Sequence, residues 1–332
     1  MNLDRCAALA VMALFAFSGV CSGQETTLRY VGTLPVNHFI TEASETYAKK
    51  VAEKTGGKVK IIVHPTSQLY PADAIGAAVA TGAVEMGDNI TAVWSNSYLA
   101  QLMDLPFLIK SPAHAKRAWA RDGTLFAAYD EEMSGKGMKT LFVMLLGSGF
   151  DLAYNGTGLV SKPDQLKGMK IRSYGLLPAR AIRALGASPV AMNPSDMYLA
   201  MSQRTIDGAV TALSSIDSRK LYEVSKFATI TSSSFIVFPV NINKTKYDAL
   251  PNSVKQTLLD AGAEVQEAVL QTAVALEGKS LESIKSKGMQ IKVLSPGEQR
   301  EWSEALKPVV AAWEKDAPAQ VKKVRMWIES LE

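Results

Sequence analysis

The hydrophobic residues in the N-terminal part of the chain follow two different periods. Short apolar runs at residues 28–31 and 59–63 are typical of strands, whereas apolar residues recur at helical spacing from Ile40 to Val51. Thr55-Gly56-Gly57 then gives a typical end for that helix. A strand, a helix and a strand in such short succession predict a βαβ unit, and therefore a parallel sheet with a right-handed crossover.

The alternation of helix and strand patterns continues to Gly149 and then starts again. The first set contains a helix opening at Pro71, an apolar segment at residues 84–86, a helix at 112–133 and a strand at 139–146. The second set contains strands at 169–173, near 191 and at 206–211, with helices at 178–185 and 195–203. Two α/β sets of similar size predict two lobes with a ligand cleft between them.

A long helix is predicted over Asn252–Lys287, followed by a strand at 289–294 and a helix at 298–315. At a rise of 1.5 Å per residue the long helix would measure about 50 Å, which is more than the width of one lobe. We therefore expect it to cross both lobes. We expect lobe I to comprise residues 24–149 with about 238–277, and lobe II to comprise residues 150–237 with about 278–332.

The first 23 residues have the order of a secretory signal peptide. Arg5 precedes an apolar run from Cys6 to Val20, and the small residues Cys21-Ser22-Gly23 follow. The run is too short to span a bilayer, which takes about 20 residues. Lipid attachment at Cys21 is the alternative, although Ser18-Gly19-Val20 lacks the residues that usually precede such a site. We expect cleavage near Gly23, export to the periplasm, no cysteine in the mature protein and no later membrane span.

Composition and charge exclude several classes of protein. Hydrophobic residues make up 47% of the 332 residues, and Gly and Pro follow no short period, so the chain is neither disordered nor collagen-like. The net charge of +4 is small and scattered, which argues against nucleic-acid binding. A weak positive field still favours small anions over cations.

Residues that could perform catalysis are nearly absent from the sequence. His38, His64 and His114 lie far apart and lack metal-ligand spacing, and Gly147-Ser148-Gly149 lacks the flanking glycine of a nucleophile elbow. The sequence contains no P-loop and no G-x-G-x-x-G. We therefore expect a binding protein without metal, cofactor or enzymatic activity. A receptor for a membrane sensor, or an exported hydrolase or lyase acting on a small acid, stays as the alternative.

Arg172 is the best candidate for binding a ligand. It ends the predicted strand at 169–173, shortly before the helix that opens at Pro178. Ligands of open α/β sheets bind beyond the carboxyl ends of the strands. A guanidinium there can hold a carboxylate or a sulfonate through two parallel charge-assisted hydrogen bonds. The alternative is an arginine that pairs with a neighbouring acid or lies in solvent.

Several short motifs, in their order and spacing, resemble the solute receptors of tripartite ATP-independent periplasmic (TRAP) transporters of the C4-dicarboxylate-binding type. The resemblance covers nearly the whole mature chain. The matching segments are Gly57-Lys58-Val59-Lys60-Ile61, Pro65-Thr66-Ser67-Gln68-Leu69, Leu105-Pro106-Phe107, Pro163, Leu166-Lys167-Gly168-Met169-Lys170-Ile171-Arg172, Gly186-Ala187-Ser188-Pro189, Met197-Tyr198-Leu199-Ala200-Met201, Asp207-Gly208 and Lys220-Leu221-Tyr222-Glu223-Val224.

The resemblance implies a type II-like periplasmic binding protein whose two lobes close on the ligand. It implies that Arg172 is the main anion anchor and that the ligand is delivered to the small and large membrane subunits of a permease. We expect a monomer with a small organic anion as its ligand.

Two departures from the family pattern bear on the ligand. Many members have G-F-R, whose arginine is a second cationic contact, where this chain has Gly149-Phe150-Asp151. Many members follow the D-G turn with Q-E-N, and Thr211 takes the position of that asparagine here. With one cation in place of two, we expect a single anionic head, a carboxylate or a sulfonate, and a polar group that Asp151 could accept. The alternative for Asp151 is that it caps a turn and faces solvent.

The remaining candidates for the cleft wall follow from the predicted elements. They are Asn37, His38, Tyr70, Asn89, Trp94, Tyr174 and, more weakly, Ser214 and Ser215. Asn37 and His38 open the first helix, where main-chain amides favour anions. The aromatic residues in this set suit core or hinge packing equally well.

Overall fold

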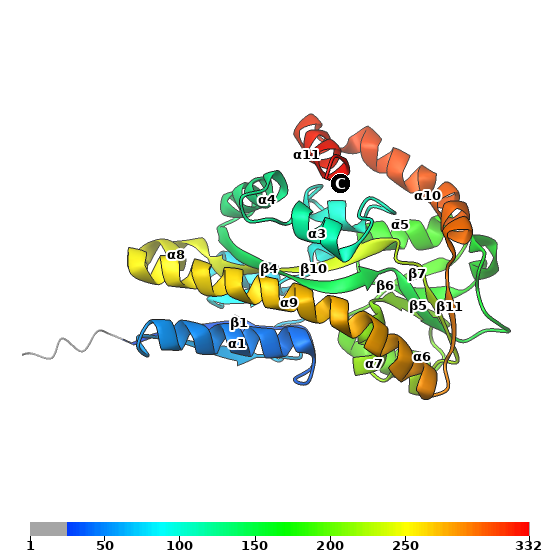
Figure 1. Ribbon diagram of the computed structural model, residues 1–332, viewed down its shortest axis with the longest axis horizontal. Helices are drawn as coiled ribbons and strands as arrows, with labels where there is room; N and C mark the ends of the chain where they lie inside the picture. Colours follow the sequence, from blue (N-terminus) through cyan, green and yellow to red (C-terminus); the bar gives the residue numbers. More distant parts are fainter. Residues whose placement is uncertain (1–24, 332) are drawn as a thin grey trace, which may run out of the picture.

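The computed structural model describes residues 25–331, so the expected signal peptide and the alternative lipid site at Cys21 lie outside the described residues. Two sheets organise the chain (Figure 1). The first contains β1 (Thr26–Val31), β2 (Val59–His64), β3 (Met86–Asp88), β4 (Met138–Gly149) and β10 (Ser234–Asn243). The second contains β5 (Asp151–Tyr154), β6 (Lys170–Ser173), β7 (Ser188–Ala191), β8 (Gly208–Thr211), β9 (Phe227–Ile230) and β11 (Gln290–Val293).

Helices connect and cover the strands of both sheets. Those around the first sheet are α1 (Phe39–Lys54), α2 (Ile75–Thr81), α3 (Pro112–Ala118), α4 (Thr124–Gly135) and α8 (Lys244–Ala249), with short 3-10 turns at Thr91–Val93 (η1) and Ala100–Asp104 (η2). Those around the second are α5 (Leu176–Ala184), α6 (Met197–Ser202) and α7 (Leu213–Ser218), with turns at Pro163–Leu166 (η3), Pro194–Asp196 (η4) and Leu221–Glu223 (η5). The last three helices are α9 (Asn252–Ser286), α10 (Pro296–Asp316) and α11 (Ala319–Glu329).

The sheet of lobe I has the strand order β2-β1-β3-β10-β4. β1 pairs in parallel with β2, with Thr26 opposite Val59, so the predicted βαβ unit is confirmed. β10 runs antiparallel to both β3 and β4. All ten residues of β10 are buried, which explains why no alternation of apolar and polar residues predicted this strand.

The sheet of lobe II has the order β11-β9-β5-β8-β6-β7. β6 is parallel to β7 and β8, so the carboxyl ends of these three strands meet at one edge. β5 runs antiparallel between β8 and β9, and Asp151 lies opposite Thr211. The predicted two-lobed α/β fold is confirmed.

α9 connects the two lobes over 35 residues, as predicted (Figure 1). In lobe I, Lys50 pairs with Glu264 at 2.6 Å. In lobe II, Asp217 accepts a hydrogen bond from Ser283 at 3.0 Å and pairs with Lys287 at 2.8 Å. The first half of the helix is therefore fixed to lobe I and its C-terminal end to lobe II.

Other predicted elements differ in detail. The helix predicted at 112–133 is two helices, because the chain leaves helical geometry between Trp119 and Gly123, the extended N-cap of α4. No sequence pattern indicated β5, α7, β9 and α8, which have four to six residues each, and the 11-residue α11 was also missed.

The expected lobe boundaries stay a prediction, and the strand assignments refine them. The chain leaves the first sheet between Gly149 and Asp151 and returns to it between Ile230 and Ser234, a few residues before the expected 238. α10 lies on lobe II, where the indole of Trp302 donates to the Ser161 carbonyl at 2.9 Å.

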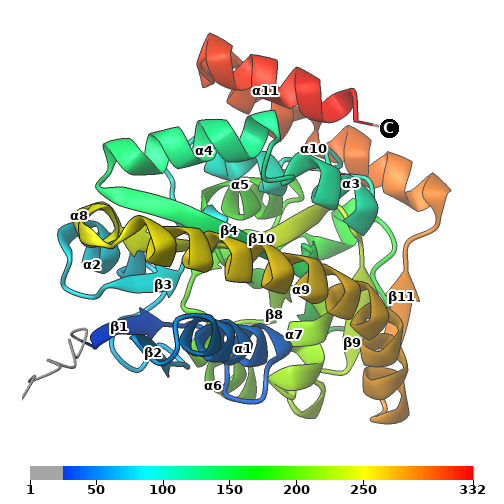
Figure 2. The same cartoon turned by 60° about the vertical axis from the view of Figure 1, so that its left-hand side comes forward.

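α11 instead lies beside α4 of lobe I (Figure 2), and the His114 ring bonds the Ile328 carbonyl at 2.8 Å. The C-terminal helices therefore contact both lobes. In residues 25–331 no helix combines the length and the apolar character that a membrane crossing needs.

Candidate ligand-binding cleft

A cavity of about 430 Å³ lies between the lobes at the carboxyl ends of β6 and β7. Its lobe I wall comes from the loops at residues 72–73 and 90–95, and its lobe II wall from residues 172–179 and 191–194. This volume falls within the range typical of small-molecule sites. The position is the one that ligands take in open α/β sheets.

Arg172 lies on the wall of this cavity, as its position at the end of β6 predicted. Its side chain is only 2% exposed. Nε donates to the Met192 carbonyl at 3.0 Å and Nη1 donates to the Val210 carbonyl at 3.1 Å. A guanidinium carries five N–H donors, so within residues 25–331 these two bonds leave most of its donors, including both on Nη2, without an acceptor.

The positive charge of Arg172 has no ion-pair partner in residues 25–331. Burial, and then the positive charge of Arg219, lower the pKa of Arg172 to about 9. The arginine ion pairs in the described part of the chain involve only Arg29 and Arg325. The guanidinium is therefore still a cation at neutral pH, buried without an ion pair in residues 25–331, although Tyr174 and Asp196 act on it from farther away and raise its pKa. Such a charge is costly unless an anion joins it.

Tyr174 and Gly175 bring the second lobe against the first. The Tyr174 ring lies 5.7 Å from the Arg172 guanidinium carbon, and its hydroxyl is 3.3 Å from the Ser234 hydroxyl. Burial and the nearby Asp104 carboxyl raise the pKa of Tyr174 well above its usual value. A Cβ on Gly175 would lie 2.4 Å from the Ala92 carbonyl oxygen, so the lobes touch directly at this point.

Asn37 and His38 line a different cavity, of about 470 Å³, between α1, α7 and α9. His38 is the N-cap of α1, and its Nδ1 accepts from the Ile40 amide at 3.2 Å. Its Nε2 is buried without a partner in the described chain. Burial, and then the charge of Arg219, lower the pKa of His38 to about 3. The ring is therefore neutral, and its Nε2 carries the hydrogen.

A family model for "Bacterial extracellular solute-binding protein, family 7" (DctP) matches residues 30–316. The chain belongs to this family. It is 29% identical over 274 residues to the 2,3-diketo-L-gulonate-binding periplasmic protein YiaO of Escherichia coli (strain K12), covering 80% of this chain and 81% of the relative. It is 30% identical over 268 residues to the C4-dicarboxylate-binding periplasmic protein DctP of Rhodobacter capsulatus, covering 79% and 78%.

Solved structures of extracellular receptors share the fold of this family 7 chain. One is a Bordetella pertussis receptor binding pyroglutamic acid, with a TM-score of 0.85, 21% identity and coverage of 91% of this chain and 99% of the other. Another is a TRAP solute-binding protein from Roseobacter denitrificans with bound β-D-glucuronate, with a TM-score of 0.85, 23% identity and coverage of 92% and 100%. The predicted membership of the DctP family is confirmed.

Asp151 does not line the Arg172 cavity of this family 7 protein. Its side chain is fully buried where the chain passes between the lobes. Oδ2 accepts from the Ser148 hydroxyl at 2.8 Å, and Oδ1 accepts from the amides of Thr231 at 2.9 Å and Ser232 at 3.2 Å. Burial raises the pKa of Asp151 to about 7, against the lowering effect of these donors. Its contact with ligand stays a prediction.

The other sequence candidates are spread over both lobes. Asn89 is buried with both amide atoms unpartnered in the described chain, and so is the indole nitrogen of Trp94. The two side chains pack over Gly76, where a Cβ would lie 2.4 Å from Trp94. Tyr70 packs on the hydrophobic core.

Two further candidates lie within lobe II. Thr211 is buried at the end of β8, and Ser215 is buried on α7. Ser214, the neighbour of Ser215, lines the cavity between α1, α7 and α9, and its hydroxyl has no partner in residues 25–331. Ligand contact stays a prediction for each of these residues.

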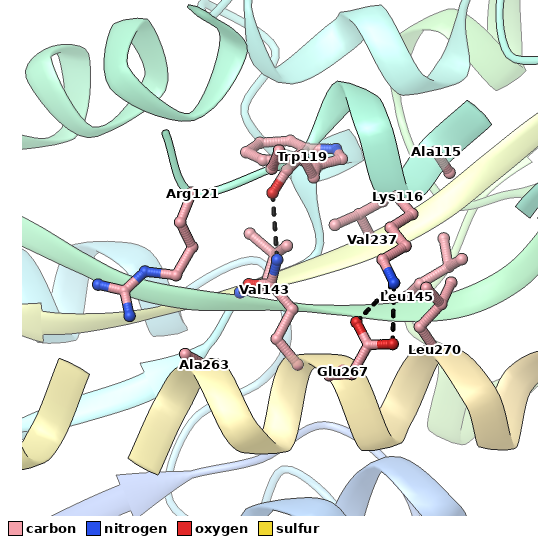
Figure 3. A pocket seen from close by; sticks show the side chains of 12 residues that line it. Ala115, Lys116, Trp119, Arg121, Val143, Leu145, Val237, Ala263, Glu267 and Leu270 are labelled. Carbon is pink, nitrogen blue, oxygen red and sulfur yellow. Dashed lines mark hydrogen bonds and ion pairs between the residues drawn. The ribbon is translucent and has the colours of Figure 1, made fainter. Parts of the chain in front are cut away.

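A smaller cavity, of about 220 Å³, lies outside the cleft between α3, α9 and β4 (Figure 3). Here Lys116 points to Glu267 at 2.8 Å, and Arg121 points away from that pair and donates to the Leu259 carbonyl at 2.6 Å. Gln266 accepts from the Val143 amide at 2.9 Å and donates to the Trp119 carbonyl at 3.1 Å. Its charged groups already have partners within the chain, so this cavity lacks the unmatched charge of the cleft.

Proposed function

We propose that this protein is the exported receptor of a TRAP uptake system. It binds a small organic anion between its lobes and passes it, chemically unchanged, to the small and large membrane subunits of a permease. Family membership supports this proposal, and so do the two relatives and the two solved structures named above, whose ligands are all carboxylates. The observation that carries it is Arg172, a cation buried in an interlobe cavity without an acidic partner.

Arg172 can supply much of the affinity that a receptor needs. Micromolar binding corresponds to about −8 kcal/mol. Each hydrogen bond to a charged group contributes about 1.5–3 kcal/mol, so two bonds from the unused guanidinium donors would contribute about 3–6 kcal/mol. The bonds to Met192 and Val210 hold the guanidinium in place before the ligand arrives, which reduces the ordering cost on binding.

Closure of the lobes completes the site. The ligand stabilises the closed form in proportion to its contacts with both lobes. Asn89 and Trp94 offer unpartnered polar atoms from lobe I, while Tyr174 adds an aromatic wall beside Arg172. We propose these three side chains as ligand contacts. We keep ligand contact as a proposal for five residues farther from Arg172, two of which line the cavity between α1, α7 and α9: Asn37 and His38, with Tyr70, Thr211 and Ser215 outside that cavity.

The remaining parts of the proposal concern export and assembly. Cleavage near Gly23 releases the mature receptor into the periplasm. The receptor acts as a monomer, and its closed form presents a composite surface of both lobes to the permease. Because the ligand leaves unaltered, turnover of a bound acid would contradict the proposal.

Replacement of Arg172 tests the proposed anchor. A thermal-shift screen of small organic acids identifies a ligand, and calorimetry then measures its dissociation constant. Arg172→Ala is expected to raise that constant at least tenfold with the fold retained, and Arg172→Lys, which keeps the charge, is expected to lose less. The matched control is Arg183→Ala, an exposed arginine on α5. An unchanged constant in Arg172→Ala would remove this residue from the anchor role.

A further inference from the structure

Arg219 is a second arginine at the cleft, and no sequence pattern singled it out. It directly follows α7, and its main-chain amide donates to the Ser215 carbonyl at 3.1 Å. Its Nη1 donates to the Pro194 carbonyl at 3.2 Å, and Pro194 lines the Arg172 cavity. Its Nη2 is buried and has no partner within residues 25–331. One face of this guanidinium is thus fixed and the other is free to bind.

The charge of Arg219 reaches both sides of the cleft. It lowers the pKa of Arg172 in lobe II and the pKa of His38 in lobe I. Burial lowers the pKa of Arg219 itself to about 10, so it is still a cation at neutral pH. Within residues 25–331 neither cation has a carboxylate in ion-pair contact, although Asp196 acts on Arg172 from farther away. Two neighbouring buried cations that repel each other make a site suited to negative charge.

Residues on both sides of Arg219 in the chain line the cavity between α1, α7 and α9, where neutral hydrogen-bonding groups lie beside the charged Glu42, Asp217 and Lys220. The hydroxyls of Ser214 and Ser218 on α7 are buried without partners in the described chain. Both residues line the cavity of about 470 Å³ between α1, α7 and α9, together with His38. The Nε2 of His38 carries a hydrogen and is likewise unpartnered. Arg219 therefore lies between the Arg172 cavity, at Pro194, and a cluster of free polar groups shared by both lobes.

We infer that Arg219 is a second anion-contacting residue of the cleft. The ligand then carries a second negatively charged group, held by Arg219 at the end remote from the one held by Arg172. This inference rests on the proposed function and concerns the same cleft. The expectation of a single anionic head counted one cation, at Arg172, and left out Arg219. The second cation comes from α7 rather than from position 151.

Matched pairs of acids test this inference. The probes are succinate with butyrate, glutarate with pentanoate, and glucarate with gluconate, because each pair differs in a terminal carboxylate. We expect the wild-type protein to bind the diacid of at least one pair tenfold or more tightly. Arg219→Gln is expected to weaken binding of that diacid at least tenfold by calorimetry and to change binding of the monoacid less than twofold.

A charge-keeping variant and a variant at an exposed site serve as controls. Arg219→Lys, which keeps the charge, should retain part of the preference, and Arg183→Gln, an exposed site on α5, should leave both affinities unchanged. Equal binding of both members of a pair, or an unchanged preference in Arg219→Gln, would overturn the role of Arg219 alone. A wild-type protein that binds none of the six acids, but binds another acid of the screen with an affinity that Arg219→Gln leaves unchanged, would overturn this inference alone, whereas one that binds no acid of the screen would overturn the proposed function with it.

Discussion

Arg172 and Asp151 are two buried charged side chains in the same sheet, separated by β8 alone, yet their surroundings differ. The chain offers Arg172 two main-chain acceptors and leaves most of its donors unused beside a cavity. For Asp151 it provides three donors, which occupy both carboxylate oxygens. Burial and charge alone therefore do not identify a ligand contact. The deciding observation is whether the chain itself already satisfies the group.

Asp151 stabilises the crossing between the lobes. Phe150 and Ser232 lie on the two crossing segments, and both adopt the left-handed backbone region, with φ values of 60° and 49°. Such conformations are costly for residues other than glycine. The Asp151 carboxylate bonds the Ser232 amide and so helps to hold one crossing in place against the other. This is an architectural role.

The largest expected effect is on stability. Asp151→Ala leaves the buried amides of Thr231 and Ser232 and the Ser148 hydroxyl without their acceptor. We expect it to lower the free energy of unfolding by about 3 kcal/mol, because unsatisfied buried donors cost about 1–3 kcal/mol each. Urea unfolding measures this change, and the exposed Asp122→Ala is the control, expected to change the free energy by less than about 0.5 kcal/mol. An unchanged stability of Asp151→Ala would contradict the architectural role.

The second effect is a pH dependence that the isosteric Asp151→Asn should remove. The folded protein holds the Asp151 proton up to a pKa of about 7, whereas the unfolded chain releases it near the ordinary value of 3.8. Between these values the folded state binds more protons, so wild-type stability falls as pH rises. From pH 5 to 7 we expect the wild type to lose about 2 kcal/mol relative to Asp151→Asn.

The comparison with the asparagine variant isolates one carboxyl group. Burial also raises the pKa values of Asp88 and Asp104 to about 7, so the wild-type curve alone sums three groups. In the variant, Oδ1 can keep the two amide bonds, and Nδ2 can donate to the Ser148 hydroxyl. Parallel stability curves for the two proteins across this pH range would show that Asp151 ionises normally.

The sequence predicted the position of Arg172 at the cleft and the two-lobed fold because both depend on local patterns. Arg172 ends an apolar strand that the chain follows with a helix, and βαβ order places such an end at the cleft. Arg219 follows α7, a helix of six residues without a period long enough to detect. Its proximity to Arg172 depends on how α7 packs within lobe II, and its proximity to His38 arises only when the lobes meet, so no spacing along the chain indicates either.

The orientation of Asp151 was equally beyond sequence patterns. Family resemblance marked the position, but the side chain's direction depends on Phe150 and on the return segment at residues 231–233. The return segment lies at least 80 positions away from Asp151 in the chain. Strand register and the geometry of the crossing segments depend on tertiary packing. A charge reversal in the sequence therefore does not show which way the new side chain points.

The smallest effect concerns closure of the cleft over Arg172. Gly175→Ala places a Cβ about 2.4 Å from the Ala92 carbonyl oxygen of the other lobe, whereas the extended backbone of Gly175 suits alanine. We expect calorimetry with the best acid of the screen to show about tenfold weaker binding, while stability changes little because the clash exists only when the lobes touch. Gly135→Ala, with open space around the new Cβ, is the control. Wild-type affinity in Gly175→Ala would mean that the bound protein does not press Ala92 against this turn, and Arg172 would then bind its anion in a more open cleft.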